Sequence, residues 1–371
     1  MRPLDGIVVL DLTRLLPGAA ATMQLANFGA EVIKIEEPER GDYSRWLPPY
    51  LDGEGALFHM VNRGKKSLAL DLKSAGGRTA FLGLAQTADV VVESFRPGAM
   101  QRLGLGYDAL RERNQRLIYV SITGYGQDGP LASLAGHDIN YMALGGALDL
   151  NGARGGPPVI PGIQIADLAG GALQAVIAVL LALAAREKTG RGQSVDVGML
   201  AGVAWLLPVA LGVYAAQGEA PARGDSVLTG RYACYGIYEA AGGRSIAVGA
   251  LEPKFWQALC HALDCDQFIP DQFAEGPRRE EIIAELARIF LTRTAEEWYE
   301  RLQAVDACVT PVRNVAEVAA HFGLGPGDSV VVPRLNDTPG LLGGRPPRLG
   351  EHTSEILGAP GGTGLPAGPS S

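Results

Sequence analysis

Three side chains that can move protons stand out in this sequence, and each lies beside a break in an apolar stretch. His137 occurs next to a glycine in GHDINY, Asp167 opens a long apolar segment, and Glu252 interrupts VGALEPKFW just before Pro253. Histidine and carboxylate side chains are the usual general acids and bases of enzymes. Each also has a purely structural explanation: a satisfied buried histidine for His137, and helix N-terminal acids for the two carboxylates. Sequence spacing alone does not bring the three together.

Two basic turns are expected at the ends of strands in one sheet. Residues 62–66 (NRGKK) precede the strand-like run SLALDL, and residues 94–98 (SFRPG) follow VVVES. Solvated surface charge is the alternative explanation for either turn taken alone. In open α/β sheets, however, ligands gather outside the strand ends, and Arg or Lys at those places suits phosphate groups. The two turns together therefore favour an anionic small ligand.

Several cofactor and metal motifs are missing from the sequence. LTRLLPGAAA follows the first strand in place of G-x-G-x-x-G, which argues against a nicotinamide dinucleotide, and there is no P-loop or G-x-S-x-G turn. The 4 cysteines form no CxxC pair and the 5 histidines are scattered, so we expect no metal and a reducing compartment. The net charge of −8 argues against a general nucleic-acid binder.

Two apolar segments, 168–185 and 199–216, are about long enough to span a bilayer. The first is rich in small residues and the second is broken by Pro208. Helices that are apolar all round also occur in buried cores and large subunit interfaces, so we expect burial and no membrane span. The start of the chain shows no basic region followed by an apolar run and a cleavage site, which favours a cytoplasmic protein.

The elements that must position these side chains alternate between strands and helices. We expect strands at 7–12, 31–36, 67–72, 89–93 and 117–122, with helices at 18–28, 76–87 and 167–188. This alternation predicts an α/β fold whose parallel sheet is covered by helices. A hairpin-like run at 232–249, followed by helices at 253–263, 278–290 and 294–304, predicts a second, smaller α+β domain.

Many of these runs, taken in order, match one family. They include PLDGIVVLDLTRLLPGAAATMQLANFGAEVIKIE, DLK at 71–73, ADVVVESFRPG, RLGLGYDAL, LIYVSITGYGQDGP, GHDINY, TGRGQSVDVGML, VGALEPKFW and DACVTPV. Over residues 3–320 the chain resembles the family III coenzyme A transferase superfamily, and within it the α-methylacyl-coenzyme A racemases. The resemblance implies a Rossmann-like large domain with a parallel sheet, a smaller α+β domain, and an interlocked homodimer.

The resemblance and the order of elements together give the expected domain limits. Residues 1–198 are expected to form the first part of a large coenzyme A-binding domain, 199–228 a linker helix region, 229–305 the small domain, 306–357 the return to the large domain, and 358–371 a disordered tail. The tail prediction depends on its low-complexity composition, GAPGGTGLPAGPSS from 358 onward.

The resemblance also assigns site residues. His137 and Asp167 match the two proton-transfer residues of the racemases, and Glu252 matches the glutamate that orients the histidine. The positions that match coenzyme A contacts are Leu70, Asp71, Leu72, Lys73, Ser94, Phe95, Arg96, Arg102, Gly136, Asp138, Ile139, Asn140 and Tyr141. Racemases often carry a basic residue near the adenine, where this chain has Glu37; Arg40 is the candidate replacement. Coenzyme A is expected only as part of the substrate, with no metal.

The expected reaction is racemisation of 2-methyl-branched acyl-coenzyme A epimers, a reaction of lipid metabolism. Neutral His137 would take the α-proton from one epimer while protonated Asp167 donates to the opposite face. Backbone N–H groups beside Gly170 and Gly171 would hold the enolate oxygen. The alternative is a transferase that moves coenzyme A between carboxylic acids through an Asp167 anhydride. His137 favours racemisation, since the transferases as a rule do not keep this histidine; a non-enzymatic coenzyme A-binding dimer is a further alternative.

Overall fold

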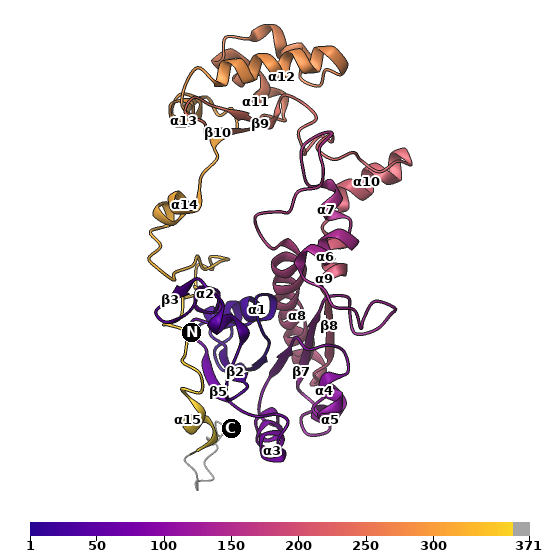
Figure 1. The fold of residues 1–371 in the computed structure, drawn as a ribbon, viewed down its shortest axis with the longest axis vertical. Helices are drawn as coiled ribbons and strands as arrows, with labels where there is room; N and C mark the ends of the chain where they lie inside the picture. Colours follow the sequence, from indigo (N-terminus) through magenta and orange to yellow (C-terminus); the bar gives the residue numbers. More distant parts are fainter. Residues whose placement is uncertain (359–371) are drawn as a thin grey trace. The chain divides into compact units, whose positions relative to one another are not determined.

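The computed structural model describes residues 1–358, so the predicted tail lies outside the described residues apart from Gly358. The chain divides into two compact units. Unit 1 contains Met1–Ala147, Pro161–Leu207 and the residues from Leu324 onward, and unit 2 contains Leu148–Ile160 and Pro208–Gly323. Figure 1 shows the elements of both units, and each unit is described by itself.

Unit 1 is built on a six-stranded parallel sheet with the order β5-β2-β1-β6-β7-β8. Its strands are β1 (Val8–Leu12), β2 (Glu31–Glu36), β5 (Lys66–Ala69), β6 (Val90–Glu93), β7 (Ile118–Thr123) and β8 (Ser194–Gly198). Strands β6 and β7 are buried along their whole length, as expected where helices cover both faces of a parallel sheet. The order corresponds to the 3-2-1-4-5-6 order of Rossmann folds, with the switch point between β1 and β6. The predicted α/β fold is confirmed.

Local sequence signals explain where the larger helices of unit 1 begin. Pro17 starts α1 (Pro17–Asn27), because its fixed φ and missing N–H suit a first helical turn. Ser74 caps α3 (Ala75–Ala85) by accepting the Gly77 N–H at 2.9 Å. The shorter elements are η1 (Tyr43–Trp46), β3 (Tyr50–Leu51), β4 (Glu54–Gly55), α2 (Ala56–Val61), α4 (Ala99–Arg102), α5 (Tyr107–Arg111), α6 (Asp138–Leu144), α9 (Met199–Trp205) and α15 (Thr353–Leu357).

The long apolar segment forms one helix from Ala166 to Thr189. It begins as a π-helix, η2 (Ala166–Leu173), and continues as α8 (Gln174–Thr189) beside β7 and β8 (Figure 1). Its start packs closely on α9, because a Cβ at Gly202 would lie 2.2 Å from the Gly170 carbonyl oxygen. By length and composition alone the helix could cross a membrane. In this single chain its burial is partial, since Leu181 is 66% exposed.

Unit 2 contains a three-stranded antiparallel sheet with the order β11-β10-β9. Strands β9 (Tyr235–Glu239) and β10 (Ser245–Gly249) form the predicted hairpin, and Trp256, Phe290 and Trp298 are central to a core between this sheet and its helices. The remaining elements are α7 (Ala147–Leu150, at the boundary of the units), α10 (Pro208–Gln217), α11 (Pro253–Ala262), η3 (Asp266–Asp271), α12 (Gly276–Phe290), α13 (Ala295–Leu302), η4 (Gln303–Val305), β11 (Val309–Pro311) and α14 (Val315–Phe322).

Three of the expected domain limits are wrong. Residues 148–160, expected within the large domain, belong to unit 2. The chain does not return to the large unit at 306, because β11 pairs with β10 and completes the small sheet, and the chain stays with unit 2 as far as Gly323. Residues 199–207 are not a linker, because α9 packs on η2 within unit 1. These errors come from long-range contacts, which the local pattern of residues does not report.

Candidate active site

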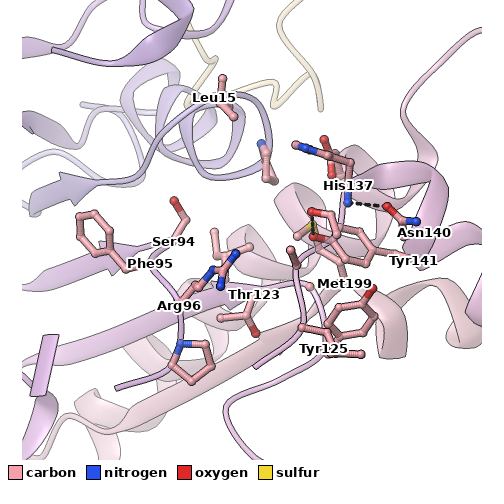
Figure 2. Close-up of a pocket in the computed structure, with 18 of the residues that line it drawn as sticks. Leu15, Ser94, Phe95, Arg96, Thr123, Tyr125, His137, Asn140, Tyr141 and Met199 are labelled. Carbon is pink, nitrogen blue, oxygen red and sulfur yellow. Dashed lines mark hydrogen bonds between the residues drawn. The ribbon is translucent and has the colours of Figure 1, made fainter. Parts of the chain in front are cut away.

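A cavity of about 470 Å³ opens at the carboxyl ends of β1, β6 and β7, next to the switch point of the sheet. The turns after these three strands, the loop ahead of α6 and the start of η2 form its lining, and Figure 2 shows the side chains that point into it. His137 and Asp167 both line it, although 30 residues separate them in the sequence. The fold therefore places the two predicted proton-transfer residues in the lining of one cavity.

The turn after β1 is held by buried charges. Leu15 has φ of 61°, a left-handed conformation that costs a non-glycine residue free energy and persists only where the surroundings enforce it. Asp42 accepts the Leu15 N–H at 3.2 Å, and Lys34 donates to the Thr13 carbonyl at 2.8 Å. Lys34 and Asp42 are themselves paired at 2.8 Å and almost fully buried. This network fixes the backbone that forms one wall of the cavity.

Lys65 and Asp11 complete the same network beneath the turn. Their side chains are fully buried and 3.0 Å apart, and Lys65 also donates to Thr22 and Asn62 at 2.8 Å. The neighbouring Lys66 is instead a surface residue, with its side chain 33% exposed, and it pairs with Glu31 and Glu355.

We predict that Lys65→Met lowers the free energy of unfolding by about 3 kcal/mol, because it leaves the Asp11 carboxylate buried with one cation fewer. The control Lys66→Met is expected to cost less than about 1 kcal/mol, as exposed ion pairs do. Urea unfolding of both variants beside the wild type measures the difference. Equal losses in the two variants would contradict the account of the buried network.

The basic turn after β6 is fixed to its neighbours by two hydrogen bonds. Glu93 accepts the Phe95 N–H at 2.7 Å, and the Ser94 hydroxyl accepts the Arg14 N–H at 3.1 Å. Burial raises the pKa of Glu93, while hydrogen bonds from Ser121 and Phe95 oppose the shift. The turn thus presents Ser94, Phe95 and Arg96 to the cavity from a rigid base. All three belong to the predicted coenzyme A contacts.

Two tyrosines shape the loop that carries His137. The Tyr141 hydroxyl donates to the Gly136 carbonyl, and the rings of Tyr125 and Tyr141 meet edge to face with centroids 5.2 Å apart. A Cβ on Gly136 would lie 2.6 Å from the Tyr125 hydroxyl oxygen, so a larger residue here would displace the tyrosine side chains. The His137 N–H donates to Asn140 Oδ1 at 3.0 Å as α6 begins, and the His137 side chain stays exposed at the cavity (Figure 2).

Asp167 lies in the first turn of the π-helix, a helix type that is frequent at functional sites. Its N–H donates to Asp138 Oδ1 at 2.9 Å, which holds the start of η2 against the start of α6. Burial and the nearby Asp138 charge raise the pKa of Asp167 to about 6, and His137 opposes the shift. The carboxyl group therefore keeps a protonated population near neutral pH.

The first two N–H groups of this helix already have hydrogen-bond partners within the protein. The Asp167 N–H is bound to Asp138, and the Leu168 N–H donates to the Gln164 carbonyl at 2.9 Å. Gly170 instead permits close packing, since a Cβ there would lie 2.9 Å from the Met199 carbonyl oxygen. These two N–H groups therefore do not bind an enolate oxygen, and the role of the N–H groups beside Gly170 and Gly171 stays a prediction.

Some of the other predicted coenzyme A contacts line a second cavity, and others line neither of the two cavities. Residues 70–73 line a second cavity of about 130 Å³, together with Glu37 and with two residues shared with the first cavity, Arg14 and Phe95. Arg40 does not line it; its guanidinium lies 5.4 Å from the Trp46 ring centroid. Three predicted residues line neither cavity: Arg102, Asp138 and Ile139. Arg14 was not predicted, although it lines both.

Glu252 belongs to unit 2, where it precedes Pro253 as the N-cap of α11. Its side chain is exposed and makes no capping hydrogen bond, but its place at the start of α11 agrees with the structural explanation of an acid favoured by the helix dipole. Its role toward His137 stays a prediction. Within residues 1–358 no cluster of three or more His, Cys, Asp or Glu side chains could hold a metal ion.

Comparisons with known proteins identify the family. The family model "CoA-transferase family III" matches residues 4–353. The chain is 37% identical to human alpha-methylacyl-CoA racemase over 95% of this chain and 92% of that protein, and 36% identical to acetyl-CoA:oxalate CoA-transferase of Acetobacter aceti over 85% and 82%. A crystal structure of a CAIB/BAIF family protein from Brucella suis has a TM-score of 0.82 at 31% identity and covers 96% of this chain and 98% of that one. The chain belongs to CoA-transferase family III, whose enzymes use coenzyme A substrates.

Proposed function

We propose that this enzyme interconverts the epimers of 2-methyl-branched acyl-coenzyme A thioesters. The observation that carries the proposal is the pair of His137 and Asp167, two acid–base groups of different type in one cavity. Racemisation needs a group on each face of the α-carbon, one to remove a proton and one to return a proton. The pKa of Asp167, raised to about 6 by burial, suits a carboxyl group that must donate as well as accept.

Each direction of the reaction then uses the same two groups in exchanged roles. The imidazole of His137 takes the α-proton from one face, and the electron pair of the broken C–H bond moves into the thioester as an enolate. The carboxyl O–H of Asp167 gives its proton to the opposite face, and the enolate collapses to the thioester of the other epimer. In reverse, the Asp167 carboxylate removes the proton and the His137 imidazolium returns one. Glu252 would orient the imidazole and stabilise its cationic form.

The proposed enzyme is an interlocked homodimer in the cytoplasm. Unit 1 leaves large apolar side chains uncovered in the single chain, with Trp205 72%, Leu181 66% and Ile163 65% exposed. Surfaces of this kind are typical of subunit interfaces. A second copy of the chain would cover them, and the solution mass would then be twice the 38.9 kDa of the monomer.

The second candidate is coenzyme A transfer between carboxylic acids. It is favoured by the relatives, because named transferases resemble the chain about as closely as the named racemases. Here the Asp167 carboxylate would attack the thioester carbonyl carbon, and the carbon–sulfur bond would break. Coenzyme A would depart as its thiolate, and the acyl group would stay bound to Asp167 as a mixed anhydride. This route gives His137 no role in the bonds that form and break, which is why we rank it second.

The two reactions differ in what they require besides the thioester. A single epimer of a 2-methylacyl-coenzyme A is incubated with the enzyme, once alone and once with added carboxylic acids, and the products are separated by chiral chromatography. We expect the opposite epimer to accumulate in both mixtures at the same rate. Appearance of new thioesters only with an added acid, and no epimerisation without it, would establish the transferase instead.

The pH dependence separates the same two mechanisms. Proton transfer between two faces needs one proton on the His137–Asp167 pair, so kcat/KM should fall both when the pair binds a second proton and when it loses the last one. Nucleophilic transfer needs only the ionised carboxylate of Asp167, whose pKa is about 6, so its rate should fall only as the pH drops through about 6. Initial rates between about pH 5 and pH 9 give the pH dependence of kcat/KM. A value of kcat/KM that stays constant at alkaline pH would count against racemisation.

A further inference from the structure

Arg14 occupies the junction of the two cavities of unit 1. The larger cavity contains His137 and Asp167, the smaller one contains residues 70–73, and Arg14 and Phe95 line both. Arg14 lies in the turn after β1, directly before the left-handed Leu15. The buried charges beneath this turn therefore fix the backbone of a residue that faces both spaces.

Aromatic rings hold the guanidinium of Arg14 in place. Its carbon lies 5.0 Å from the Tyr43 ring centroid and 5.4 Å from that of Phe95, and Nη1 donates to the Tyr43 hydroxyl at 2.9 Å. Stacking of this kind orients the planar group without neutralising its charge. Side-chain entropy that would otherwise oppose ligand binding is thus already lost in the free protein.

The charge of Arg14 is not balanced by a carboxylate. Arg45, which also lies over a ring, 3.8 Å from the Phe58 centroid, forms ion pairs with Glu36 and Glu54 at 2.7 Å. No carboxylate among residues 1–358 forms such a pair with Arg14, whose guanidinium has the Tyr43 hydroxyl as its hydrogen-bond partner. An oriented, uncompensated guanidinium that lines two neighbouring cavities is suited to bind an anionic group of a ligand that extends into both.

We infer that Arg14 binds the diphosphate of coenzyme A. The inference rests on the thioester substrate of the proposed function, but not on the choice between racemase and transferase. The reacting end of the thioester must reach His137 and Asp167, and the adenine is expected near Glu37, which lines the smaller cavity. In coenzyme A the diphosphate is the anionic group between these two ends. A carboxylate on the acyl group is joined to the other side of the thioester and is therefore not between these two ends.

Binding of coenzyme A fragments to Arg14→Gln tests the inference by isothermal titration calorimetry. We expect the Kd for coenzyme A and for dephospho-coenzyme A to rise by the same factor, roughly 10- to 100-fold, because both ligands contain the diphosphate. The Kd for pantetheine, which has no phosphate, should stay within about 2-fold of the wild-type value. An equal loss of pantetheine binding, or a loss for coenzyme A but not for dephospho-coenzyme A, would overturn the assignment.

Two further variants sharpen this test. Arg14→Lys keeps the charge but cannot stack or form a planar two-point contact, so we expect a smaller but clear loss of coenzyme A binding. Arg113→Gln removes an exposed arginine that lines neither cavity and should leave every Kd unchanged. If wild-type protein bound no coenzyme A at all, the proposed function would fail together with this inference. If wild type binds but Arg14→Gln loses nothing, only this inference fails.

Discussion

Asp167→Asn abolishes epimerisation in both directions and makes the folded protein more stable at pH 8. The loss of activity follows because an amide neither removes nor returns a proton, and we expect kcat to fall by roughly 10³-fold or more. The gain in stability follows because the wild-type carboxylate is ionised at pH 8 in a site where burial disfavours its charge. One substitution should therefore separate function from stability.

The size and pH dependence of this gain follow from the shifted pKa. The pKa of Asp167 is raised from 3.8 to about 6, and two units correspond to at most roughly 3 kcal/mol of unfolding free energy. The penalty is fully present above about pH 6, where the folded-state carboxyl is ionised. It disappears below about pH 4, where both states are protonated. Urea unfolding at several pH values should show the advantage of Asp167→Asn shrinking as the pH falls.

The exposed residue Asp128 provides the matched control, since it lies at the surface of unit 1. Asp128→Asn should change the unfolding free energy by less than about 0.5 kcal/mol at every pH. If Asp167→Asn were destabilising at pH 8, the ionised carboxylate of Asp167 would be more stable in the folded protein than in the unfolded chain. That result would remove the physical reason for a protonated Asp167 near neutral pH.

His137→Gln is expected to lower the rate of epimerisation by roughly 10²- to 10⁴-fold, because one of the two faces of the α-carbon loses its acid–base group. Asp167 remains, so α-proton exchange with solvent should persist for the one epimer whose proton faces the carboxylate. Nuclear magnetic resonance of each epimer in deuterated water measures exchange separately from epimerisation. A transferase would behave differently, because His137→Gln would leave acyl transfer to added acids largely intact.

The fold of this variant should be unaffected, since the His137 side chain is exposed. His321→Gln, a change of the same kind at an exposed position of α14 in unit 2, is the control for non-specific effects. It should keep full activity. If His137→Gln exchanged both epimers at the wild-type rate, His137 would not be one of the two proton-transfer groups.

The central strands could be predicted from the sequence because they are short apolar runs between turn signals. The β1, β6 and β7 segments are rich in valine and isoleucine, as fully buried parallel strands usually are. The edge strand β8 has the sequence SVDVG and is partly exposed, so it lacks that signal. The place of β11 depends on pairing with β10, some 60 residues earlier, and no local pattern encodes it.

The site was harder to predict than the fold. From the sequence alone, His137 is explained equally well as a structural histidine and Asp167 as a helix N-cap. Only the resemblance to the family assigns the two residues to one site. In the structure the start of η2 contacts the start of α6, because the Asp167 N–H donates to the Asp138 side chain. Arg14 was overlooked, although its place in TRLLPG directly after β1, at the switch point, was a usable signal.

The central claim is that two unlike groups move protons on opposite faces of one carbon, and solvent deuterium tests it most directly. Wild-type enzyme is given one pure 2-methylacyl-coenzyme A epimer in deuterated water with no acceptor acid, and early products are analysed by chiral separation and mass spectrometry. The account predicts that the opposite epimer appears with one deuterium at the α-carbon. Absence of α-deuterium, with acyl groups moving only after an acceptor acid is added, would contradict it.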